Sequence, residues 1–143
     1  MSKAAGATLE KQILAWVETL PAGVVRLTVE QVEMERVMRM EPTRVGAASI
    51  ELRIADYGGC GVYAGEGFMI EELRGAPEMA IQICGGVRDG LLQERIWRWR
   101  DKTVLVDSVL KLPSGQLRSS IARRWWLLVL LPRKQEVLYP PWV

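Results

Sequence analysis

Short runs of alternating apolar and polar residues, separated by turn signals, occupy much of this 143-residue chain. In residues 48–56, isoleucine and leucine alternate with polar neighbours, and residues 92–100 and 103–112 also alternate. A period of two residues is typical of a strand with one buried face. Runs of such strands joined by short turns favour an antiparallel sheet over a repeating strand–helix–strand fold.

Two segments carry a helical period instead. Apolar side chains recur three and four positions apart over residues 8–20 and 76–90, approximately, which predicts two amphipathic helices. Gly85 and Gly86 interrupt the second pattern at a cost of roughly 1 kcal/mol each relative to alanine, which indicates close packing against a sheet. We therefore expect a single α+β domain over residues 1–143. It should have an antiparallel sheet of about five to seven strands, with both helices on one face.

Two segments are harder to place from the pattern alone. Residues 33–40 fit both a strand and a helix, and they lack a glycine, asparagine or proline for a hairpin tip, so extended structure is favoured but left open. Residues 125–131 form a seven-residue apolar run, which predicts a central strand buried on both faces. The alternative is that residues 123–134 form a membrane-interface insert, because this segment has basic ends and two tryptophans that could anchor it.

A glycine-rich segment carries the one motif that resembles a cofactor signature. Residues 59–64, GCGVYA, match the spacing G-x-G-x-x-A of dinucleotide-binding loops. Such a loop needs a helix N-terminus directly after it, whereas the residues that follow here are typical of a strand or turn. The segment is therefore expected to form a hairpin, and no cofactor is predicted.

The absence of histidine restricts the chemistry open to this chain. Ser-His and Cys-His nucleophilic pairs, histidine-ligated metals and histidine acid–base catalysis are excluded. Cys60 and Cys84 are predicted to be structural free thiols, and no metal site is predicted from them. A carboxylate or metal-dependent enzyme, with Asp56 and Glu66 meeting across a hairpin, is a remaining alternative, but we expect a protein that is not an enzyme.

The charge is distributed unevenly along the chain. Residues 1–94 contain 9 Lys and Arg against 14 Asp and Glu, a net charge of −5, while residues 95–143 contain 10 against 3, a net charge of +7. Such an asymmetry indicates surfaces for partners of opposite charge. The alternative is that the charges simply solvate the outer faces of strands.

Two partner hypotheses follow from this charge pattern. The first is a protein-binding module, such as an immunity or inhibitor protein that neutralises a toxin or enzyme, with a protein-binding surface at Glu30, Glu33, Glu35 and Glu41. The second is RNA or single-stranded DNA binding through the Trp- and Arg-rich C-terminal third, at Arg98, Arg100, Arg123 and Arg124.

The sequence also carries expectations about location. No apolar run approaches 18 residues, so no transmembrane helix is expected. The first residues lack the apolar core of a signal peptide, which predicts a cytoplasmic protein. A short chain that is expected in the cytoplasm and carries no recognisable set of catalytic residues is typical of a small accessory protein of bacterial type.

Overall fold

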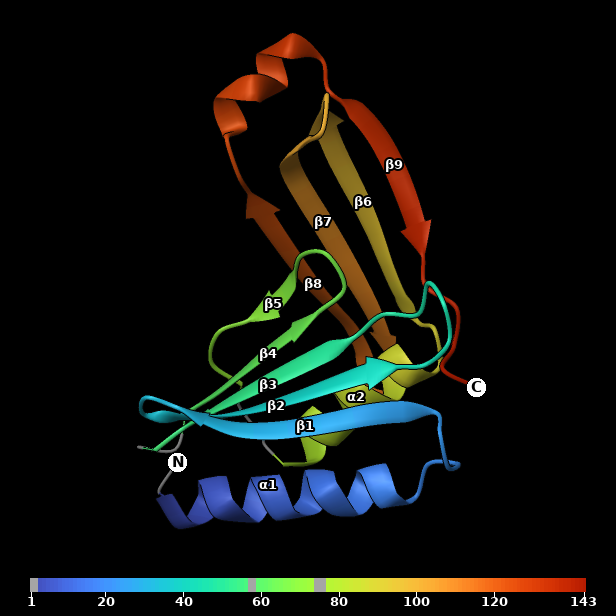
Figure 1. Cartoon of the computed structure of the whole chain (residues 1–143). Helices are drawn as coiled ribbons and strands as arrows, with labels where there is room; N and C mark the ends of the chain where they lie inside the picture. Colours follow the sequence, from blue (N-terminus) through green and yellow to red (C-terminus); the bar gives the residue numbers. More distant parts are fainter. Residues whose placement is uncertain (1–2, 57–58, 74–76) are drawn as a thin grey trace.

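The elements follow one another in the order helix, strands, helix, strands (Figure 1). The computed structural model describes residues 3–56, 59–73 and 77–143. The first part of the chain contains α1 (Lys3–Glu18), β1 (Val25–Val32), β2 (Glu35–Pro42), β3 (Ile50–Ala55), β4 (Cys60–Ala64) and β5 (Phe68–Ile70). The second part contains α2 (Glu78–Arg88), β6 (Leu92–Trp99), β7 (Lys102–Leu112), β8 (Gly115–Ala122), the 3-10 helix η1 (Trp125–Leu130) and β9 (Arg133–Leu138).

The α+β class is confirmed, and the strands divide into two antiparallel sheets. Sheet A has the order β1-β2-β3-β4-β5, and sheet B has the order β8-β7-β6-β9. Nine strands are thus described where one sheet of about five to seven was expected. Residues 33–40 account for part of this difference, because Glu33 adopts a left-handed φ of 54° and closes a β1–β2 hairpin without glycine. Along the chain, α2 lies between the last strand of sheet A, β5, and the first strand of sheet B, β6.

Both helices pack on one face of sheet A, as expected. Leu9 of α1 and Ile83 of α2 are fully buried in the same core as Leu52 and Val62 of the sheet. α2 also contacts sheet B through Gly86, where an added Cβ would lie only 3.1–3.3 Å from atoms of β7. The glycine in the middle of this helix therefore reflects a close approach to the strand. The start of the expected helix at residue 76 lies outside the described residues, and the observed helices span 3–18 and 78–88.

Sheet B joins the rest of the molecule at one end and projects from it at the other (Figure 1). At the near end, Leu92 and Leu110 belong to the same buried core as the helices. The β4–β5 hairpin covers part of the inward face of sheet B, where a Cβ on Gly67 would lie 2.7 Å from Val106. The far end carries η1 and lies farthest from α1 and α2 in Figure 1.

Candidate functional site

The apolar run 125–131 does not form the central strand that its composition predicts. Residues 125–130 form η1, which connects β8 to β9. β8 and β9 are the two edges of sheet B, so the chain between them has to cross the end of the sheet. Arg124 (φ 49°) and Leu131 (φ 52°) both adopt left-handed backbone and change the chain direction at the two ends of η1. The expected strand is therefore wrong, because this run connects two sheet edges and pairs with none of the strands that the structure describes.

This crossing leaves a group of large apolar side chains in solvent. The end of a single sheet offers a surface on one side of η1 only, whereas the run is apolar on all sides. The exposed fractions are 57% for Trp126, 40% for Leu128, 82% for Val129, 47% for Leu130 and 88% for Leu131. Contiguous exposed apolar groups of this kind are uncommon on a monomer and mark interaction sites.

Basic side chains surround these apolar residues. The ends of β6 and β8 and the starts of β7 and β9 all lie at the same end of sheet B as η1. We name residues 123–134 together with residues 98–102 the distal tip. Its basic residues are Arg98, Arg100, Lys102, Arg123, Arg124, Arg133 and Lys134.

The predicted nucleic-acid-binding arginines all lie in the distal tip. Arg98 and Arg100 line a hollow of about 510 Å³ together with Arg133, Lys134 and Gln135, while Arg123 and Arg124 lie at the end of β8. The Arg100 guanidinium lies 4.5 Å from the ring centroid of Trp99. The tertiary fold thus brings together basic residues that the sequence separates by more than 20 positions.

The predicted acidic protein-binding residues lie on β1, β2 and the turn between them. Glu30 pairs with Arg39, Glu41 pairs with Arg26, and Glu35 lies 3.9 Å from Arg53. Glu33 is at the exposed tip of the β1–β2 hairpin. Because arginines on the same sheet offset three of the four charges, this surface does not form the concentrated acidic patch that the sequence suggests.

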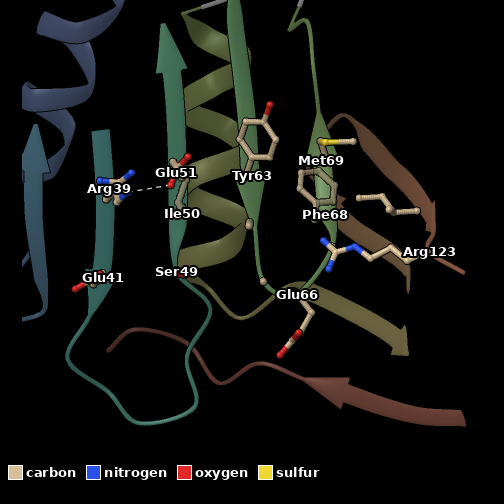
Figure 2. Close-up of a pocket in the computed structure, with 14 residues that line it drawn as sticks. Arg39, Glu41, Ser49, Ile50, Glu51, Tyr63, Glu66, Phe68, Met69 and Arg123 are labelled. Atoms are coloured by element: carbon tan, nitrogen blue, oxygen red, sulfur yellow. Dashed lines mark hydrogen bonds and ion pairs between the residues drawn. The ribbon is translucent and has the colours of Figure 1, made fainter. Parts of the chain in front are cut away.

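A groove of about 410 Å³ lies between the outer face of sheet A and the end of β8 (Figure 2). Glu51 accepts hydrogen bonds from Arg39 and Arg53 in its wall, and Arg123 reaches toward the β4–β5 hairpin from β8. Partial burial tends to raise the pKa of Glu51, but the hydrogen bonds and positive charges of these two arginines lower it below its usual value. Glu51 therefore stays ionised at neutral pH and is a poor general acid.

The structure also contains a buried carboxylate that sequence reasoning missed. Glu94 on β6 is only 1% exposed. Its Oε1 accepts hydrogen bonds from the Glu66 backbone N–H (2.7 Å) and the Tyr139 hydroxyl (2.5 Å). Its Oε2 accepts from the Gly67 backbone N–H (3.0 Å) and the Ser108 hydroxyl (2.6 Å).

These four bonds join the β4–β5 turn of sheet A to sheet B and the C-terminal segment. Each oxygen of Glu94 accepts two hydrogen bonds from donors within the protein, which favours a structural role for this carboxylate over a catalytic one. The available signal was its position: Glu94 lies two residues from both Leu92 and Ile96, so the period of two places it on the same, buried face of the strand. A carboxylate at an inward strand position requires buried donors, and the sequence alone does not identify them.

Tyr139 provides a pH-dependent test of this cluster. Burial, the hydrogen bond to Glu94 and that residue's negative charge raise the pKa of Tyr139 above its usual value of about 10. Because the pKa is higher in the folded state than in the unfolded state, this stabilisation is complete below pH ~10 and declines as the pH rises further. We expect Tyr139→Phe to lower the free energy of unfolding by about 1–3 kcal/mol at pH 7. The free energy of unfolding of this variant should also fall less steeply at alkaline pH than that of the wild type, as measured by urea unfolding across this pH range. Identical declines in both proteins would contradict this role.

The two cysteines and the two carboxylates of the alternative metal site lie at positions that do not favour catalysis or metal binding. Cys60 and Cys84 are both buried free thiols, and burial raises their pKa values to about 11 and about 12. Neither is therefore a thiolate nucleophile at neutral pH. Asp56 and Glu66 lie near opposite ends of β4, so they do not meet across a hairpin. Residues 59–64 fall mainly in β4, and β5 follows them instead of a helix.

Comparison of this chain with protein-family models, curated proteins and solved structures found no match. In the part of the chain that the structure describes, no helix has the length and apolar character needed to cross a bilayer.

Proposed function

We propose that this chain is a non-enzymatic binding module that docks on a larger partner through its distal tip. The observation that carries this proposal is the exposure of five large apolar side chains on η1 and at Leu131, surrounded by basic residues. Their exposure costs free energy in water, and contact with a partner would recover part of it. The tip contains Trp and Arg, the residue types that dominate binding hot spots.

Several observations favour binding over catalysis. The chain has no histidine, and the pKa values of both cysteines are raised by burial. Glu51 in the groove is held ionised by two arginines, and Glu94 has its oxygens occupied by four donors. We also propose a cytoplasmic location, which the two free thiols support. An immunity or inhibitor role, in which the partner is a toxin or an enzyme, stays a hypothesis.

Nucleic-acid binding is the second candidate, and one observation favours it. Arg98, Arg100, Arg133 and Lys134 line one hollow, and Trp99 lies beside Arg100. Cations that neutralise phosphate beside an aromatic ring suit single-stranded RNA or DNA. Binding of this kind weakens steeply with salt, and alanine at Arg98, Arg100, Arg123 and Arg124 should reduce that salt dependence.

The proposed function is tested by following diffusion of the labelled chain in extract of the native host by fluorescence correlation. We expect a slowly diffusing, bound fraction for the wild type, and its loss in Val129→Ser/Leu131→Asn, which removes two of the most exposed apolar side chains of the tip. The matched control is Met34→Ser/Val45→Ser, which removes exposed apolar side chains away from η1 and should leave the bound fraction unchanged.

Other outcomes would count against the proposal. If the tip variant and the wild type diffuse alike, the distal tip is not the docking surface. If nuclease treatment releases the bound fraction, the nucleic-acid candidate replaces a protein or lipid partner. The variants themselves should fold normally, because the substituted side chains are largely in solvent.

A further inference from the structure

The shape of the distal tip restricts the kind of partner it fits. η1 crosses the end of sheet B farthest from both helices, so the apolar side chains stand on a projecting end of the molecule (Figure 1). Val129 and Leu131 are 82% and 88% exposed. A projecting apolar segment can enter a soft apolar layer without rearrangement of the fold, whereas a groove-forming surface would have to receive a partner segment.

The charges of the tip restrict the partner further. Arg100, Arg123, Arg124 and Arg133 form no ion pair with any residue that the structure describes. Arg98 lies 3.8 Å from Glu66, and Lys134 lies 4.0 Å from Glu136. The other acidic residue of this end is Asp101. A partner with a high density of negative charge is therefore favoured, and the cations come from the ends of several strands around η1.

The apolar residues distinguish a lipid surface from a nucleic acid. Leu128, Val129, Leu130 and Leu131 are consecutive, and none offers the flat ring on which a base stacks. A single-stranded nucleic acid would therefore use the arginines and leave most of the exposed apolar surface in water. An anionic bilayer uses both parts, because its phosphate groups attract the cations while its interface accepts leucine, valine and tryptophan.

We propose that the distal tip binds anionic phospholipid bilayers peripherally, with η1 and Leu131 inserted at the level of the headgroups. Arg124 and Arg133 then lie beside the lipid phosphates, and the rest of the fold stays in water. This inference rests on the proposed function, since it names the partner of the same docking surface. The absence of a membrane-crossing helix among the described residues is compatible with binding at the surface.

The test is co-sedimentation of the purified chain with vesicles. One set contains phosphatidylcholine only, and the other contains about one-third phosphatidylglycerol, a surface charge sufficient to attract basic segments. We expect the wild type to bind the anionic vesicles at least about tenfold more tightly than the neutral ones, with binding that weakens as salt is added.

Two variants separate the apolar and electrostatic contributions. Val129→Ser/Leu131→Asn should bind anionic vesicles at least about tenfold more weakly, because two inserted apolar side chains are lost. Arg124→Gln/Arg133→Gln should also weaken binding by about tenfold and reduce its dependence on salt. Met34→Ser/Val45→Ser should bind like the wild type.

The result that would overturn the proposal is absence of wild-type binding to the anionic vesicles, or equal binding by the wild type and Val129→Ser/Leu131→Asn. If vesicles are not bound but the bound fraction in host extract still depends on Val129 and Leu131, the lipid partner is wrong and the docking surface stands. If neither depends on the tip, both proposals fail. Binding to a single-stranded oligonucleotide that survives Val129→Ser/Leu131→Asn, without vesicle binding, would assign the tip to nucleic acid.

Discussion

Replacing Glu94 with alanine is expected to lower the free energy of unfolding by about 3–5 kcal/mol, a large fraction of the stability of a typical domain. The substitution removes the acceptor of four hydrogen bonds at a position that is 1% exposed. The N–H groups of Glu66 and Gly67 would then lie in a cavity without a partner, which costs more than the bonds contributed. Urea unfolding followed by far-UV circular dichroism measures the loss.

Two further variants make this prediction specific. Glu94→Gln should lower the free energy of unfolding less than Glu94→Ala, because the amide oxygen still accepts hydrogen bonds. Some loss remains, because the amide nitrogen faces donors and cannot accept from them. Glu136→Gln, at an exposed position of sheet B, should change stability by less than about 0.5 kcal/mol. Equal effects of Glu94→Ala and Glu136→Gln would show that the buried cluster does not stabilise the fold.

Gly65 gives an independent test of the same cluster. Its backbone is left-handed, with φ of 60°, and an added Cβ would lie 2.4 Å from Glu94 Oε1. Gly65→Ala should therefore destabilise the protein through backbone strain of about 1–2 kcal/mol and through displacement of the carboxylate. Gly23→Ala is the control, because its φ of 80° is also left-handed but nothing lies within 4 Å of an added Cβ. A difference between these two variants isolates the effect of moving Glu94.

Replacing Trp142 with alanine is expected to cost about 3–5 kcal/mol, because a large ring is removed from a packed core. The side chain is 2% exposed, and its Nε1 donates a hydrogen bond to the Ala48 carbonyl at 2.9 Å. Its ring centroid lies 6.2 Å from that of Trp16 on α1. The Trp142 backbone N–H also donates to the Arg88 carbonyl at 2.7 Å, which joins the C-terminal segment to the end of α2.

The neighbouring residue provides the matched control for Trp142. Val143 is 68% exposed, and Val143→Ala should change stability by less than about 0.5 kcal/mol. Trp142→Phe should fall between the two, because it keeps most of the packing and loses the hydrogen bond to Ala48. If Trp142→Ala is no more destabilising than Val143→Ala, the C-terminal segment does not contribute to the core.

Local patterns in the sequence predicted most of the individual elements. The alternation around Ile50, Leu52 and Ile54 corresponds to β3, and the helical spacing of Leu9 and Ile13 corresponds to α1. Each of these signals lies within a few consecutive residues, so it does not depend on distant parts of the chain. The β1–β2 hairpin was harder to predict, because Glu33 is not a residue type that favours left-handed backbone.

The candidate site depended on arrangements that a local pattern does not contain. The acidic character of residues 30–41 suggested a binding surface, but strand register places Arg39 beside Glu30 and Arg26 beside Glu41. The basic residues near positions 98–100, 123–124 and 133–134 meet only because the ends of four strands coincide.

The sequence by itself determined the α+β class, the main helical and strand segments, and the exclusion of histidine chemistry, because these follow from residue type and short-range period. Only the tertiary structure decided that Trp126 and residues 128–131 of the apolar run are exposed. Seven apolar residues have the same composition in a central strand and in a crossing over the end of a sheet. Burial depends on which strands lie beside the segment. Here β8 and β9 are opposite edges, and the described residues place no further layer over η1. The same reason applies to Glu94, whose donors come from three distant parts of the chain.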